Sequence, residues 1–188
     1  MGDLLRKSLE NAAVVDFGGY SYFVHPLTDG IPEIDPALLR EVVEEAVAVA
    51  DVDVDRIVTV EAMGIPLATA LSLRTGIPVS VVRKRKYGLP GEREIGQETG
   101  YSKGHLYLNG LHPGDRVLVV DDVISTGGTL DPLLTALHAA GVQVHDVLVL
   151  IEKGEGRAEV ERKHGLRIRT LAKIEVRDGR VRVLEETA

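Results

Sequence analysis

A single stretch, residues 117–130, sets the strongest limit on how this chain can fold. It opens with four aliphatic residues, 117–120, which predict a strand buried on both faces, as in a parallel sheet. Two aspartates follow at the expected end of that strand, and a loop with two adjacent glycines comes next. A helical pattern then begins at Leu130 and stops at Gly141. This order predicts a ligand site at the carboxyl edge of an open α/β sheet.

The glycine-rich loop has the chemistry of a phosphate cradle. Its glycines let the backbone approach a ligand closely, and the N–H groups at the start of the next helix favour an anion. The predicted phosphate ligands are Ser125, Thr126, Gly127, Gly128 and Thr129. Asp121 and Asp122 would repel a phosphate. They suit sugar hydroxyls, a divalent cation, or a carbon that gains positive charge.

This stretch resembles the phosphoribosyl diphosphate signature of the type I phosphoribosyltransferases, nearly position for position. The main alternative is the acidic strand of a nucleotide hydrolase, which requires an upstream G-x-x-x-x-G-K-[ST] loop that the sequence lacks. A purely structural loop is disfavoured, because two adjacent aspartates beside two glycines are costly without a ligand. The resemblance implies an α/β fold: a mostly parallel twisted sheet flanked by helices, with a small hood and a mobile lid loop.

Length and composition fit one domain that spans residues 1–188. The chain has 188 residues, of which 44% are hydrophobic and 27% charged, as is ordinary for a globular protein with a sizeable core. We expect the hood at about residues 13–34 and 152–188, and the lid at about residues 84–104.

Charge and cysteine content exclude several classes of partner. The net charge of −7 disfavours broad binding to nucleic acid or to an anionic membrane. The longest apolar run, residues 147–151, is too short to span a bilayer, and residues 1–10 lack the apolar stretch of a signal peptide. The absence of cysteine fits a reducing compartment. We therefore expect a cytoplasmic protein.

Residues 17–30 contain four of the aromatic side chains of the chain, which has five Tyr and two Phe, and they predict a strand or hairpin followed by a turn. The rings either fill the core or stack on a flat ligand. The second interpretation resembles the hood of adenine and xanthine phosphoribosyltransferases, which clamps the purine. It implies Phe23 and Val24 as base contacts, with Val123 or Ile124 against the other face of the base.

A second strand–loop–helix unit is predicted over residues 56–76. Residues 56–60 indicate a buried strand, and residues 67–74 a helix closed by Gly76. The loop between them resembles the pyrophosphate-binding loop of the family, which implies four ligands: Glu61, Ala62, Met63 and Gly64. Relatives often carry Arg or Lys here, so uncharged Ala62 and Met63 leave more of the binding to backbone donors. A non-proline cis peptide is common in this loop, and we expect it between Ala62 and Met63.

Four consecutive cations, residues 83–86, follow a predicted strand at 79–82. Such a run is usually a solvated face, and the acidic residues that follow it disfavour a nucleic-acid patch. The resemblance instead implies that Arg83 and Lys84 bind pyrophosphate, in some relatives across a subunit interface, and so implies a homodimer. Residues 87–104 predict a long loop without regular structure, which resembles the family's mobile lid.

Lys153 follows the buried strand predicted over residues 142–151. It is either a surface lysine or a ligand contact at the same sheet edge. Residues 151–153 resemble a motif of the xanthine and archaeal hypoxanthine/guanine enzymes, in which the lysine faces position six of the purine. An ammonium group only donates, so it satisfies a 6-oxo group and opposes the amino group of adenine. Beyond it we expect a helix at 157–163, a strand at 167–171, and a hairpin that turns at Asp178.

The resemblance implies purine salvage: phosphoribosyl diphosphate and a purine base give a nucleoside monophosphate and pyrophosphate. It implies Asp121 and Asp122 as catalytic residues that hold the ribose hydroxyls, directly or through Mg²⁺ and water, and stabilise a positive ribose ring. Ser125 stands where mammalian-type hypoxanthine/guanine enzymes have an acidic Asp, which favours the adenine/xanthine branch. The overall resemblance over residues 22–171 favours the archaeal hypoxanthine/guanine enzymes.

We predict a 6-oxopurine as the base, with adenine or xanthine as alternatives and uracil or orotate as weaker ones. A non-catalytic regulator that senses phosphoribosyl diphosphate is the alternative of another class. It would need an added DNA-binding domain and a basic face, which neither the length nor the charge of this chain supplies.

Overall fold

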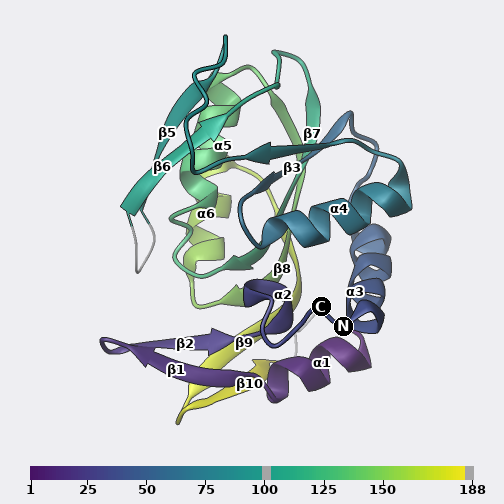
Figure 1. Ribbon diagram of the computed structural model, residues 1–188, viewed down its shortest axis with the longest axis vertical. Helices are drawn as coiled ribbons and strands as arrows, with labels where there is room; N and C mark the ends of the chain where they lie inside the picture. Colours follow the sequence, from purple (N-terminus) through teal and green to yellow (C-terminus); the bar gives the residue numbers. More distant parts are fainter. Residues whose placement is uncertain (99–102, 185–188) are drawn as a thin grey trace.

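The computed structural model describes residues 1–98 and 103–184, and its central sheet has the strand order β10-β9-β8-β7-β3-β4 (Figure 1). The strands of this sheet are β3 (Arg56–Val60), β4 (Val79–Val82), β7 (Arg116–Ile124), β8 (Gln143–Lys153), β9 (Ile168–Arg177) and β10 (Arg180–Leu184). All neighbouring strands from β4 to β9 are parallel, and only β10 pairs antiparallel within this described sheet. The predicted mostly parallel sheet is confirmed.

Helices cover both faces of the sheet. Figure 1 shows α3 (Pro36–Val49) and α4 (Gly64–Thr75) on one side, and α5 (Leu130–Ala139) and α6 (Gly156–His164) on the other. The four aliphatic residues at 117–120 in β7 are fully buried, because alternate side chains enter two different cores. Leu118 and Val120 pack under α3 and α4, whereas Val117 and Val119 pack under α5 and α6. None of the described helices is long and apolar enough to cross a membrane.

Local sequence determines where α3 and α4 begin and end. Asp35 caps α3, since its side chain accepts hydrogen bonds from Ala37 N at 2.6 Å and Leu38 N at 3.0 Å, and Pro36 occupies the first helical position. The α4 helix ends at Gly76, whose φ of 77° lies in the left-handed region.

A separate hairpin stands at the carboxyl edge of the sheet. Its strands β1 (Ala13–Phe17) and β2 (Tyr20–Val24) pair antiparallel around Gly18 and Gly19, and α2 (Pro26–Asp29) follows. Figure 1 shows this hairpin beside β9 and β10 and next to α1 (Asp3–Glu10). The hood over residues 13–34 and 152–188 stays a prediction; of its described parts, the hairpin is a sheet of its own, whereas β9 and β10 extend the central sheet.

The prediction of a long loop without regular structure over residues 87–104 is partly wrong. The chain forms β5 (Arg93–Glu98) and β6 (Lys103–Leu108), an antiparallel pair, and residues 99–102 between them lie outside the described residues. The pair is held by burial, since Ile95, Leu106 and Leu108 join the core under α5. A strand at residues 105–108, directly after the loop, is expected from the sequence and is confirmed as part of β6. Gly96 interrupts the alternation that would have indicated β5. Lid closure stays a prediction.

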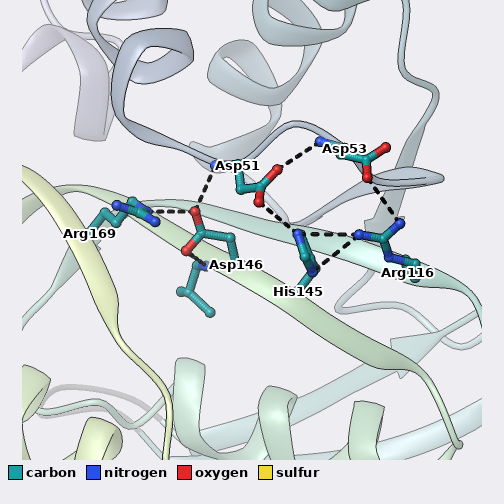
Figure 2. Close-up of polar contacts among 7 residues, drawn as sticks. Asp51, Asp53, Arg116, His145, Asp146 and Arg169 are labelled. Atoms are coloured by element: carbon teal, nitrogen blue, oxygen red, sulfur yellow. Dashed lines mark hydrogen bonds and ion pairs between the residues drawn. The ribbon is translucent and has the colours of Figure 1, made fainter.

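A polar network ties the loop after α3 to the amino ends of the strands, at the edge opposite the ligand site (Figure 2). Asp146 is buried, and its Oδ2 accepts from Asp51 N at 2.8 Å and Arg169 Nε at 2.6 Å. His145 lies at the register shift between β7 and β8, with Nε2 at 2.9 Å from Asp51 Oδ2 and the ring against the Arg116 guanidinium. This network stabilises the amino edge of the sheet and leaves the carboxyl edge to the ligand.

His25 joins the hairpin to α1 as a buried, neutral side chain. Its Nδ1 accepts from Leu27 N at 3.2 Å, and its Nε2 lies 2.8 Å from Ser8 Oγ, which donates to Leu5 O at 2.9 Å. Since Nδ1 accepts and the Ser8 proton is used, Nε2 must carry the imidazole proton. Burial lowers the pKa of His25 from 6.5 to about 4.

We expect His25 to make the folded protein less stable as the pH falls from 6.5 toward 4. In that interval the unfolded chain binds a proton that the folded chain does not, so the free energy of unfolding falls by about 3 kcal/mol over it. Urea unfolding at several pH values would measure this. His25→Asn keeps an acceptor for Leu27 N and cannot titrate, so its stability should fall less steeply. Parallel pH profiles for the two proteins would contradict the assignment.

Candidate active site

A cavity of about 260 Å³ opens at the carboxyl ends of β3, β7 and β8, beneath the β1–β2 hairpin. The predicted site residues that line it are Phe23, Glu61, Ala62, Met63, Lys84, Asp121, Asp122, Val123, Ile124, Ser125, Thr126, Gly127, Gly128, Thr129 and Lys153. The loops after β3 and β7, the end of β8 and strand β2 therefore meet around one space. Segments far apart in the chain converge as the parallel topology requires.

Three predicted site residues do not line the cavity. Val24 ends β2 beside buried His25, so its assignment as a base contact lacks support from the geometry. Gly64 lies beneath the cavity, where an added Cβ would collide with Thr59 Oγ1 and lie 3.2 Å from Asp121 Oδ1. Arg83 is held by Glu61, with Nε 2.7 Å from Oε2, and does not reach the cavity.

The sequence interpretation missed several lining residues: Tyr20, Tyr22, Thr28, Val60 and Leu130. The sequence could have identified the two tyrosines, since they belong to the aromatic stretch considered for ring stacking. They also lie two residues apart on β2, which places them on the same face of the strand. The other three lie at the ends of elements, where the sequence pattern does not tell which side chains face a cavity.

Asp121 and Asp122 lie inside β7, not after its end as predicted, because the parallel pairing with β8 continues to Ile124. The Asp122 N–H donates to Asp121 Oδ1 at 3.0 Å. Burial raises the pKa of both carboxyl groups, and the Asp121 charge raises the pKa of Asp122 further, well above its usual range. The pair therefore resists carrying two negative charges unless a positive group comes near.

The loop after β3 holds the basic run in place. The Glu61 carboxylate accepts from Lys84 N at 2.6 Å in addition to its ion pair with Arg83. The Lys84 side chain is thereby left at the cavity, and its charge lowers the pKa of Asp121, opposing the effect of burial. The expected position of the cis peptide, between Ala62 and Met63, is wrong: the non-proline cis bond joins Glu61 to Ala62, one residue earlier in the loop.

The phosphate loop is supported from behind by the start of α6. Gly156 N donates to Ser125 O at 3.0 Å, and a Cβ on Gly156 would collide with that oxygen and lie 2.5 Å from Thr126 C. Gly127 has a φ of 79°, and a Cβ there would lie 2.6 Å from the Val160 side chain. Both glycines are needed for this close approach.

Lys153 reaches from the end of β8 to the hairpin. Its ammonium group donates to Ser21 O and to Tyr20 OH, the second at 3.3 Å, and lies 4.3 Å from the Tyr20 ring centroid and 5.9 Å from that of Phe23. Its neighbour Glu152 lies behind it as a buried carboxylate. The charge at the aromatic end of the cavity is thus positive, while the central pair is acidic.

Residues 36–178 match the model of the family described as the phosphoribosyl transferase domain. The chain belongs to this family. A curated relative from Methanosalsum zhilinae, a hypoxanthine/guanine phosphoribosyltransferase, is 59% identical over 99% of this chain and 97% of its own length. A relative of the same name from Ferroglobus placidus is 56% identical over 96% of both chains.

Solved structures agree on the fold of this phosphoribosyltransferase. The adenine phosphoribosyltransferase of Thermoanaerobacter pseudethanolicus superposes with a TM-score of 0.74, at 22% identity over 90% of this chain and 98% of that chain. At this identity the likeness shows the fold alone. The β1–β2 hairpin, which supplies the aromatic wall of the cavity, lies outside the matched range of the family model.

Proposed function

We propose that this phosphoribosyltransferase transfers the 5-phosphoribosyl group of phosphoribosyl diphosphate to hypoxanthine or guanine, giving IMP or GMP and pyrophosphate. The observation that carries the proposal is the set of groups that line one cavity: the glycine-rich loop, the carboxylate pair, and aromatic rings with an ammonium group. These groups suit the three parts of a nucleoside monophosphate: phosphate, ribose and base. The curated relatives named above support the same activity.

In this proposal the loop at residues 125–129 binds the 5-phosphate through backbone N–H groups and hydroxyls, which fixes the position of the ribose. Asp121 and Asp122 face the ribose hydroxyls and the carbon that becomes positive as the diphosphate leaves. Because the pKa values of both carboxyl groups are raised, ionising the two together costs free energy in the ligand-free protein. A positively charged ribose ring beside them lowers that cost. Lys84 and the backbone at Ala62 and Met63 face the departing diphosphate.

The donor set fits Mg²⁺ bound mostly through water. Within the described residues, no cluster of three or more His, Cys, Asp or Glu side chains is placed to hold a metal ion. Mg²⁺ commonly uses one or two carboxylates together with phosphate oxygens and water, so Asp121 and Asp122 suffice as its protein ligands. When bound, the ion would offset negative charge on the diphosphate.

Lys153 supports the choice of a 6-oxopurine. Its ammonium group can donate to a carbonyl oxygen but cannot accept from the amino group of adenine. Phe23 is 4% exposed and lines the same end of the cavity, so base and ring can be in contact. Val123 or Ile124 would contact the base from the β7 side.

Homodimer formation and a cytoplasmic location without nucleic-acid or membrane partners complete the proposal. Lys84 lines the cavity, and the adjacent Arg85 and Lys86 are exposed, where a second copy could use them for the diphosphate. The net charge of −7 argues against nucleic acid.

A panel of bases tests the function and the role of Lys153 together. Hypoxanthine, guanine, xanthine, adenine and uracil would each be assayed with phosphoribosyl diphosphate and Mg²⁺. We expect the wild-type protein to favour hypoxanthine and guanine, and Lys153→Ala to lose about tenfold or more in kcat/KM for these, with a smaller loss for adenine. Equal losses for all bases would contradict the lysine assignment. A preference for adenine would indicate an adenine phosphoribosyltransferase instead. Binding of phosphoribosyl diphosphate without turnover of any base would favour a non-catalytic regulator that senses it.

A further inference from the structure

Three polar groups from separate parts of the chain lie in a row along the cavity wall. The Lys153 ammonium nitrogen is 3.3 Å from the Tyr20 hydroxyl oxygen, which in turn is 3.3 Å from Ser125 Oγ. All three side chains line the cavity. The row therefore connects the group expected at the base with the first hydroxyl expected at the 5-phosphate, and Tyr20 is its middle member.

The lysine determines the direction of one hydrogen bond in this row. An ammonium group can only donate, so the Tyr20 oxygen accepts from it. Between Tyr20 and Ser125 either hydroxyl can be the donor. When Tyr20 donates to Ser125 Oγ, the Ser125 proton is directed to another acceptor, and a phosphate oxygen bound in the loop is such an acceptor. Hydrogen bonds in a chain of this kind strengthen one another.

Pairing within the hairpin and a contact from Lys153 both hold Tyr20 in place. Tyr20 follows directly on the Gly18–Gly19 turn and pairs with Phe17 across the hairpin. Lys153 also donates to the carbonyl of Ser21, so the lysine is bonded to the backbone next to Tyr20 as well as to its hydroxyl. Tyr22 lines the same cavity, but its hydroxyl donates to Asp29 Oδ1 at 2.7 Å. Tyr22 therefore serves as a control for Tyr20: it is a tyrosine of the same strand and cavity whose hydroxyl bonds elsewhere.

We propose that Tyr20 is a positioning residue that couples the base end of the cavity to the 5-phosphate loop, so that affinity for a sugar phosphate depends on Lys153. This inference rests on the proposed function. It has a specific consequence: loss of Lys153 weakens binding of ribose 5-phosphate even when no base is present. That dependence requires the Tyr20 hydroxyl.

The test is calorimetric titration with ribose 5-phosphate alone. We expect Lys153→Met and Tyr20→Phe each to weaken binding about fivefold, the usual effect of one lost hydrogen bond. The double variant should be no weaker than either single variant. In a Tyr22→Phe background, Lys153→Met should keep its full effect. Ser125→Ala gives a second test of the coupling. In that variant Tyr20→Phe should not weaken ribose 5-phosphate binding any further.

The outcomes separate the possible failures. If Lys153→Met weakens binding by the same factor with and without the Tyr20 hydroxyl, the lysine acts through its charge alone and the coupling is refuted. If Tyr20→Phe binds ribose 5-phosphate as the wild type does, Tyr20 has no positioning role. If the wild-type protein does not bind ribose 5-phosphate at all, the proposed function fails and this inference fails with it.

Discussion

Asp122→Asn is expected to lower kcat by about 10²–10³-fold, because the variant loses a negative charge aimed at the carbon that becomes positive in the transition state. Asp121→Asn should have a similar effect, since Asp121 lines the same cavity and its Oδ1 accepts from Asp122 N at 3.0 Å. Steady-state turnover of guanine with saturating phosphoribosyl diphosphate would measure both.

The same substitution should make the folded protein more stable at pH 7. Burial raises the pKa of Asp122 above its usual 3.8, so the folded state resists ionisation that the unfolded chain undergoes freely. The free energy of unfolding therefore falls as the pH rises from 3.8 through the folded pKa, and asparagine removes that loss. The gain measured by urea unfolding should shrink as the pH is lowered toward 4.

Asp53→Asn is the matched control for both measurements. Asp53 lies at the opposite edge of the sheet, with its side chain 86% exposed and an ion pair to Arg116 at 3.2 Å. Its replacement should leave turnover and stability nearly unchanged, as is usual for an exposed pair. Near-normal turnover of Asp122→Asn would remove Asp122 from the proposed catalytic role. A variant less stable than the wild type at pH 7 would contradict the raised pKa of Asp122.

The parts of the site that are contiguous in sequence were predictable, and those that depend on packing were not. The strand that contains residues 117–120, the glycine loop and the helix that begins at Leu130 appear in the structure as expected, because each is specified by neighbouring residues. Lys153 could be placed at the same edge, since it ends a parallel strand next to β7. In each case a periodic pattern or the composition of a loop was enough to predict where the residues lie in the fold.

Three features needed the folded chain. The acidic pair lies within β7 because pairing with β8 extends that strand, which no local pattern shows. The β5–β6 hairpin forms because Ile95, Leu106 and Leu108 are buried against another part of the chain. Tyr20 reaches Ser125 across 105 positions of sequence, a contact that only the docking of the β1–β2 hairpin creates. Sequence reasoning failed where long-range packing decides the outcome.

The second large effect is expected at a glycine outside the phosphate loop. Gly156→Ala should lower kcat/KM for phosphoribosyl diphosphate by about a hundredfold, because the new methyl group has no room behind the loop and must displace it. The neighbours are backbone atoms: Ser125 O, Thr126 C at 2.5 Å and Gly127 N at 2.7 Å. Backbone cannot swing aside as a side chain can, so the loop shifts as a unit. We also expect a loss of about 1–3 kcal/mol in stability from the overpacking.

Gly165→Ala, at the other end of α6, separates the two effects. Gly165 has a φ of 65° and open space around its Cβ position, so alanine there costs about 1 kcal/mol of stability without touching the loop. The control should therefore lose stability and keep its affinity for ribose 5-phosphate, whereas Gly156→Ala loses both. If Gly156→Ala keeps wild-type affinity, α6 does not determine the position of the phosphate loop. If the two variants lose affinity equally, the effect belongs to the helix as a whole and not to the contact behind Ser125.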